Sequence, residues 1–146
     1  MQVKKSHSVG IILFRQGQRK LFYLLLKQHQ GHWSFPKGHV EKGERLIDTA
    51  TRELKEEAGI KKIDFLKKKI LLRDKYSFSN GKSKVNKIVD YYVAESLTDK
   101  VKIDGNEILS FKWLAYDKSY ERLTFAKSKK ILKKANKIIN EYISDK

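Results

Sequence analysis

The chain of 146 residues contains no cysteine, a single proline and no long uninterrupted run of apolar residues. The absence of cysteine excludes disulfide bonds, thiolate metal sites and thiol catalysis. No segment approaches the roughly 20 apolar residues that are needed to cross a bilayer. The apolar stretch from Val9 to Phe14 is interrupted by Gly10 and is too short for the core of a signal peptide. We therefore expect a cytoplasmic protein without a membrane partner, and no feature indicates an obligate protein partner.

The sequence also lacks a Pro/Ser-rich linker, an internal repeat and a low-complexity block. Its length is typical of one domain, and 40% hydrophobic and 11% aromatic residues suffice to build a core. We therefore expect a single domain over residues 1–146.

Acidic residues are scarce, with 17 Asp and Glu against 33 Lys and Arg, which gives a net charge of +16. Such an excess favours polyanionic partners, either nucleic acid or phosphorylated small molecules. The lysines are nevertheless spread along the whole chain, as a biased genome composition would also produce. Charge alone therefore does not choose between a functional and a compositional origin.

Hydrophobic periodicity predicts strands that alternate with two helices. Asn80-Gly81 is a common hairpin turn signal between two of the strands. The second helix has an apolar stripe with lysines opposite, so we expect it to pack on the sheet. The pattern indicates an α/β fold, a layered sandwich with a mixed sheet. The predicted strands span 7–14, 21–27, 69–78, 85–95 and 108–114, and the helices 45–58 and 125–143.

The first predicted helix carries three carboxylates on one side. At about 100° per residue, Glu57 falls inside the apolar arc, Glu53 on its edge and Glu56 about 80° from it. A buried carboxylate without a partner costs several kcal/mol, so Glu57 requires a cation or strong hydrogen-bond donors. A cluster of oxygen ligands suits Mg²⁺ or Mn²⁺. Arg52, four residues before Glu56, is placed to orient it. A salt-bridged surface helix is the alternative interpretation.

The residues around this helix make the metal site the stronger hypothesis. Gly38 and Gly43 bracket a loop that leads to Glu44 at the start of the helix. The segment 38–60 resembles the Nudix box: Gly, five residues, Glu, seven residues, Arg-Glu, an aliphatic residue, one residue, Glu-Glu, one residue, Gly and an aliphatic residue. Every specified position agrees, namely Gly38, Glu44, Arg52, Glu53, Leu54, Glu56, Glu57, Gly59 and Ile60.

The resemblance implies a Nudix fold, an α/β/α sandwich with a loop–helix–loop catalytic motif and a divalent-metal hydrolase activity on nucleoside diphosphate-linked substrates. It implies that Glu53, Glu56 and Glu57 hold Mg²⁺ or Mn²⁺, assisted by Glu44 and the Gly38 carbonyl, and that Arg52 orients carboxylates. The metal would activate water for in-line attack on phosphorus. Glu56, Glu57 and Glu107, on the loop before 108–114, remain alternatives for the general base.

The flanks of the box resemble asymmetrical diadenosine tetraphosphate hydrolases of the animal and archaeal type. This likeness rests on residues 33–41, 87–95, 113–114 and 123–135. The likeness implies cleavage of diadenosine tetraphosphate into ATP and AMP. One position departs from it: Asp90 stands where an apolar residue is expected. The phosphates need cations, for which Lys37, His39 and Lys87 are candidates. Adenine needs an aromatic face, for which the candidates are Tyr91, Tyr76 and Phe125.

Three alternatives remain at this point, one of which is a house-cleaning nucleoside triphosphatase. The excess positive charge would suit an enzyme that removes pyrophosphate from the 5′ end of RNA, because phosphate contacts dominate RNA affinity. The fold could also serve as a non-catalytic module that binds nucleotides or RNA. Degenerate positions in the box would be expected of such a module, and none is degenerate.

Overall fold

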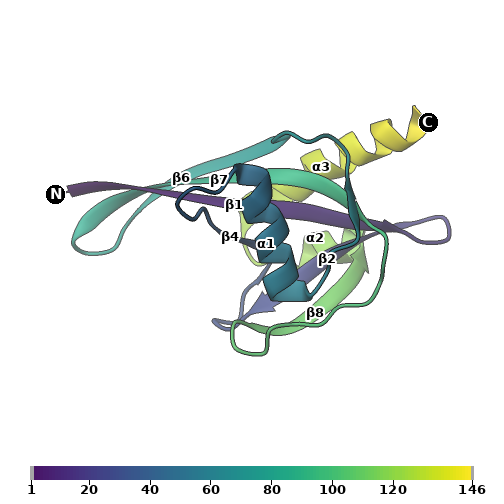
Figure 1. The fold of residues 1–146 in the computed structure, drawn as a ribbon, viewed down its shortest axis with the longest axis horizontal. Helices are drawn as coiled ribbons and strands as arrows, with labels where there is room; N and C mark the ends of the chain where they lie inside the picture. The colour runs from purple at the N-terminus through teal and green to yellow at the C-terminus, as the bar shows by residue number, and fades with distance from the viewer. Residues whose placement is uncertain (1, 146) are drawn as a thin grey trace.

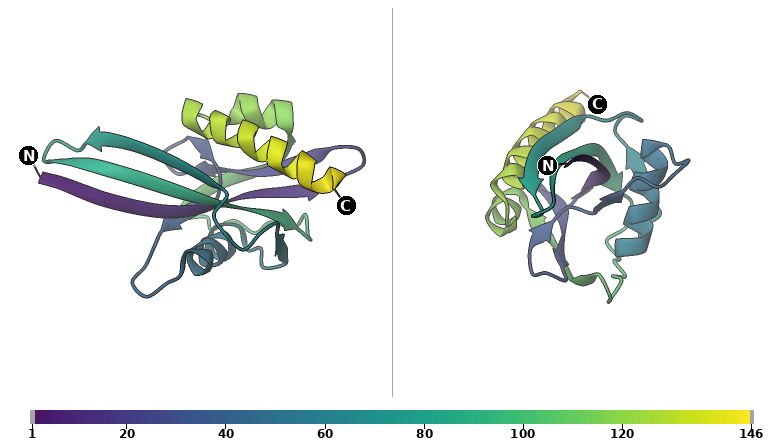
Figure 2. Two further views of the ribbon diagram at one scale, coloured as in Figure 1. Left: turned by 90° about the horizontal axis from the view of Figure 1, so that it is seen from above. Right: turned by 90° about the vertical axis from the view of Figure 1, so that its left-hand side faces the viewer.

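A computed structural model describes residues 2–145, which form one open, mixed β-sheet with helices on both faces. Figures 1 and 2 show α1 (Leu46–Ala58) on one side of the sheet and α2 (Tyr116–Arg122) with α3 (Ala126–Ser144) on the other. The architecture is the α/β layered sandwich that the sequence predicts. The strands are β1 (Gln2–Gln16), β2 (Leu21–Gln28), β3 (Trp33–Ser34), β4 (Lys37–His39), β5 (Ile63–Phe65), β6 (Leu72–Ser79), β7 (Ser83–Ser96) and β8 (Ile108–Ala115).

The centre of the sheet is a long parallel pair, β1 with β7, whose register runs from Gln2 opposite Ser83 to Phe14 opposite Glu95. All other pairs are antiparallel. β1 pairs with β2 and β4, β7 pairs with β5 and β6, and β2 pairs with β3 and β8. The N-terminal part of β1, with β6 and β7, extends beyond the helices as a three-stranded ribbon (Figure 2, left).

Alternation along β1 separates two cores. Val9, Ile11 and Leu13 face α1, whereas Ile12 and Phe14 face α3. The apolar stripe predicted for the second helix is confirmed, since Ile131, Leu132, Ala135 and Ile139 are buried against the sheet. Within the part of the chain described, no helix is long and apolar enough to cross a membrane.

Both long helices lie within a residue or two of the predicted bounds, but several strand bounds differ. β1 begins at residue 2 rather than 7, and β6 at 72 rather than 69. The short elements β3, β4, β5 and α2 were not predicted, because two to seven residues are too few to show a period.

Asp90, which departs from the apolar residue expected there, is fully buried on β7. Arg73 of β6 donates to it from Nε at 2.6 Å and Nη2 at 3.2 Å, and His7 Nε2 of β1 lies 2.7 Å from its Oδ2. The three residues belong to three neighbouring strands, so the group ties the ribbon together. The hydrogen bonds from Arg73 and His7 outweigh burial and lower the pKa of Asp90. The strand therefore keeps its register around a satisfied carboxylate.

Candidate active site

Helix α1 is well defined at both ends. Arg45 and Asp48 form a reciprocal cap at its start, and Gly59 ends it in the left-handed conformation with φ 67°. Ala50, Leu54 and Ala58 anchor its apolar face in the core. The sequence prediction that a carboxylate enters this face is confirmed, because Glu57 is only 4% exposed. Its Oε1 accepts a hydrogen bond of 3.0 Å from the backbone N–H of Lys37 on β4.

Gly38 is required by the close approach of β4 to the helix. A Cβ atom built on Gly38 would lie 2.0 Å from the Glu53 carboxyl carbon and 2.1 and 2.4 Å from its two oxygens. Any side chain at this position would push Glu53 out of place. The glycine thus sets the distance between the loop and the carboxylate face of α1.

Arg52 lies at the centre of a network of carboxylates. Its Nε donates to Glu44 at 2.6 Å, and its Nη1 donates to Glu53 at 2.8 Å and to Glu56 at 3.2 Å. Its Nη2 donates to the backbone carbonyl of His39 at 3.0 Å. The rigid guanidinium fork therefore fixes the carboxylates relative to one another and to the loop.

Glu44 is held from several directions. Besides Arg52, it accepts hydrogen bonds from the Thr49 hydroxyl and from the backbone N–H of Glu41, both at 2.9 Å. These bonds, with the one from Arg52 the largest contribution, lower the pKa of Glu44 to about 2. Both of its oxygens are engaged, so in this conformation Glu44 supports Arg52 and the loop.

The electrostatics of the buried carboxylates are different. Burial raises the pKa of Glu57 to about 8, and the neighbouring charges of Glu53 and Glu107 add to the effect. Burial also raises the pKa of Glu53. Carboxylates pushed together in a partly dry site favour either a proton or a cation between them.

These side chains line one cleft of about 460 Å³. It brings together the predicted base and phosphate residues, including Glu107, and the predicted metal residues except Glu44, which does not line it. It also contains Ser8 and Gln28, which sequence reasoning missed. Lys87 Nζ donates to Ser8 at 2.6 Å and to Ser6 at 3.1 Å. The lining residues are Ser8, Gln28, Lys37, Gly38, His39, Glu41, Arg52, Glu53, Glu56, Glu57, Lys87 and Glu107.

The donor set of the cleft fits a hard divalent cation. Glu53, Glu56, Glu57 and Glu107 supply only oxygen atoms, the ligands that Mg²⁺ and Mn²⁺ prefer. Within residues 2–145, no three Asp, Glu or His side chains already converge as a ready coordination group. In this conformation Arg52 holds Glu53 and Glu56, so a cation would compete with the guanidinium for their oxygens.

A second cavity of about 350 Å³ adjoins the cleft at Lys37. It brings together all three aromatic residues proposed for base stacking, Tyr76, Tyr91 and Phe125. Tyr91 is only 3% exposed and its ring packs against Phe35 in a T-shaped arrangement, so little of the ring is accessible to a ligand. Asp74 also lines this cavity and was missed, although its alternation with Tyr76 along β6 was a readable signal.

Sheet register explains why Lys37 lines both the cleft and this cavity. Lys37 lies opposite Gly10, which lies opposite Tyr91; in a neighbouring row Lys87 lies opposite Tyr76. Side chains two residues apart on a strand share a face, so these rows lie on the side of the sheet that α3 covers. One face therefore leads from the metal loop across the lysines to the aromatic residues.

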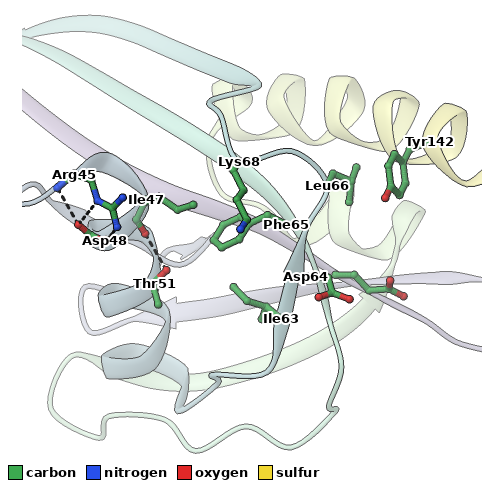
Figure 3. Close-up of a pocket in the computed structure, with 11 residues that line it drawn as sticks. Arg45, Ile47, Asp48, Thr51, Ile63, Asp64, Phe65, Leu66, Lys68 and Tyr142 are labelled. Carbon is green, nitrogen blue, oxygen red and sulfur yellow. Dashed lines mark hydrogen bonds and ion pairs between the residues drawn. The ribbon is translucent and has the colours of Figure 1, made fainter.

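A further cavity is lined by residues of α1 and β5 and by none of the box carboxylates (Figure 3). Arg45 pairs there with Asp48, and Phe65 and Lys68 lie on the opposite wall. Its charged groups do not converge on one point in Figure 3, and none of the predicted site residues lines it.

Comparison with known proteins agrees with this geometry. Residues 4–135 match the NUDIX domain model. The bis(5′-nucleosyl)-tetraphosphatase [asymmetrical] of Rattus norvegicus is 30% identical over 139 residues, covering 89% of this chain and 92% of the relative. The putative mutator protein MutT4 of Mycobacterium tuberculosis is 31% identical over 113 residues, covering 77% of this chain but only 44% of the relative.

Among solved structures, the binary complex of the C. elegans Ap4A hydrolase superposes with a TM-score of 0.79 at 25% identity. The match covers 93% of this chain and 98% of that one. Together with the complete box and its placement on α1, these matches show that the chain belongs to the Nudix hydrolase family.

Proposed function

We propose that this Nudix hydrolase cleaves dinucleoside tetraphosphates, and that diadenosine tetraphosphate is hydrolysed to ATP and AMP. The observation that carries the proposal is that Lys37 lines both the carboxylate cleft and the aromatic cavity. A substrate with a base at one end and several phosphates beyond it matches this arrangement, with the base in the aromatic cavity and the phosphates in the carboxylate cleft. The similarity to asymmetrical tetraphosphatases over most of both chains supports the same substrate class.

The phosphates would lie along the cations of the sheet face. Lys37 is half-buried and lines both cavities, and burial lowers the pKa of its ammonium, partly offset by the charges of Asp74 and Glu57. Lys87 and His39 line the cleft beside it. A bound polyphosphate would bring negative charge next to these cations. The charge-assisted hydrogen bonds from the lysines would then stabilise the bound phosphates.

Glu53, Glu56 and Glu57 would hold the divalent cation, with the Gly38 carbonyl beside them and Glu44 supporting Arg52. When bound, Mg²⁺ or Mn²⁺ would neutralise negative charge on the phosphates and lower the pKa of a bound water molecule. Attack of a water oxygen on phosphorus breaks one phosphoanhydride P–O bond and releases the two nucleotides. Arg52 keeps the carboxylates aligned for this geometry through its bonds to Glu44 and Glu53.

The proton of the attacking water must pass to a carboxylate. Glu57 is buried and engaged with the Lys37 backbone, which suits a ligand better than a proton carrier. Glu56 has a side chain 56% exposed, and Glu107 is exposed and also lines the cleft. We assign the general base to one of these two accessible groups. Glu56→Gln and Glu107→Gln separate them at saturating Mg²⁺, because loss of the base removes the acidic limb of the pH–rate profile, whereas loss of a metal ligand alone raises the Mg²⁺ concentration that is required.

The test is product analysis with Mg²⁺, using diadenosine tetraphosphate and 5′-triphosphorylated RNA in parallel. ATP and AMP from the dinucleotide, with the RNA unchanged, support the proposal. Pyrophosphate released from the RNA, with the dinucleotide intact, refutes it and gives the +16 charge a role in holding RNA. Nucleotide binding without turnover of either substrate would instead indicate a non-catalytic module.

A further inference from the structure

The aromatic cavity contains one carboxylate that the reaction itself does not need. Asp74 lies on β6 two residues before Tyr76 and opposite Val89 of β7. Its side chain therefore shares the face of the sheet with Tyr76 and Tyr91, and all three line the cavity next to Phe125. Asp74 is half-buried, so its carboxylate is only partly solvated.

Within residues 2–145, the carboxylate of Asp74 makes no hydrogen bond and no ion pair. Lys37 influences it through its charge but does not come within 4.0 Å. The other nearby cation is already engaged: Lys127 Nζ donates to the Lys75 carbonyl at 3.2 Å and lies 4.8 Å from the centre of the Tyr76 ring. Asp74 is thus an acceptor in an aromatic cavity without a donor from the protein.

A carboxylate accepts hydrogen bonds and cannot donate them when it is ionised. The Watson–Crick edge of guanine presents two adjacent donors, the ring N1–H and the 2-amino group, which match the two oxygens of one carboxylate. The same edge of adenine presents one donor, the 6-amino group, beside the N1 acceptor, which would face the second carboxylate oxygen with like polarity. The two bases stack equally well on tyrosine, so the edge decides between them.

We propose that Asp74 makes this cavity selective for guanine, so that guanosine-ended dinucleoside tetraphosphates are preferred to diadenosine tetraphosphate. The proposal rests on the proposed function in one respect, namely that a nucleotide base enters the cavity. Asp74 accepts hydrogen bonds from the edge of the base, while Tyr76 and Phe125 stack on the face of the base. The expected preference is about tenfold, the size of one charge-assisted hydrogen bond at a partly solvated site.

A different role for Asp74 would be that of a distant counter-charge to Lys37, which the electrostatic influence between the two groups permits. Loss of that charge would change phosphate binding for every substrate by the same factor. Selectivity for the base edge instead changes the ratio between substrates. The two roles are therefore separated by a ratio of rates.

The experiment compares kcat/KM for diguanosine and diadenosine tetraphosphate in the wild type and in Asp74→Asn. An amide presents one donor and one acceptor, which suits adenine, so the variant should lose the preference for guanine or reverse it. Asp117→Asn on the exposed surface of α2 removes the same charge away from the cavity and should leave the ratio unchanged. A wild-type ratio of one, or the same ratio in Asp74→Asn, overturns the proposal.

Binding of GTP and ATP, measured by calorimetry with Ca²⁺ present, gives a readout that does not depend on turnover. About tenfold tighter binding of GTP, lost in Asp74→Asn, supports the inference even if neither dinucleotide is cleaved; that result would refute only the proposed function. Cleavage of both dinucleotides at equal rates, with equal binding of GTP and ATP, would refute the inference and leave the proposed function standing.

Discussion

Replacing the buried Glu57 by glutamine tests both the electrostatics of α1 and the metal assignment. Glutamine has the shape of the protonated acid and keeps an oxygen that can accept the Lys37 backbone N–H. Because burial raises the pKa of Glu57 to about 8, the folded chain holds a proton there that the unfolded chain has released above its ordinary value of 4.5. The metal-free wild type should therefore lose stability as the pH rises from about 4.5 to about 8.

The magnitude follows from the shift. Each pKa unit corresponds to about 1.4 kcal/mol, so raising the value from 4.5 to about 8 amounts to a cost on the order of 5 kcal/mol once both states are ionised. Below about pH 4.5 both states are protonated and this cost is absent. For a chain of this length 1 kcal/mol moves Tm by about 2–4 °C, so at pH 9 Glu57→Gln should melt roughly 10 °C above the wild type without metal.

The assay is thermal unfolding at pH 5, 7 and 9, with EDTA and with Mg²⁺, alongside turnover. Mg²⁺ should raise the Tm of the wild type, most at pH 9 where the carboxylate is ionised, and should hardly affect Glu57→Gln. Turnover of the variant should fall roughly 100-fold or more. Glu141→Gln on the exposed face of α3 is the control and should follow the wild type. Coincident pH profiles for wild type and Glu57→Gln would refute the reasoning.

Four further substitutions probe the rest of the structure. Gly38→Ala should lower turnover and Mg²⁺ affinity at least about tenfold with an unchanged circular dichroism spectrum, because its Cβ displaces Glu53; normal activity would show that the loop yields. Arg52→Lys should reduce kcat roughly 10- to 100-fold, since one ammonium cannot replace a fork that spans several carboxylates, and steady-state kinetics checks this. Arg73→Ala should destabilise the fold by about 2 kcal/mol in urea unfolding, more than Asp90→Val, because only the former leaves a buried carboxylate short of donors; the reverse order would contradict this account.

Local sequence determined the helix that carries the carboxylates. A 3.6-residue period, a cap at Arg45 and a left-handed glycine at residue 59 depend only on near neighbours, so the bounds of α1 and the burial of Glu57 followed from spacing. The complete box likewise identified the family, because its fixed positions all lie within the single segment 38–60.

Only the tertiary structure decided how distant segments meet. β1 pairs with β7 across some 80 residues, and no pattern within either strand specifies that partner or its register. That register makes Asp90 the centre of an ion group and gathers Lys37, Asp74, Tyr76 and Tyr91 on one face. Periodicity predicts which way a side chain points from its own strand or helix. The residues that this side chain contacts depend on long-range strand pairing, and that pairing also sets the shape and charge of the site.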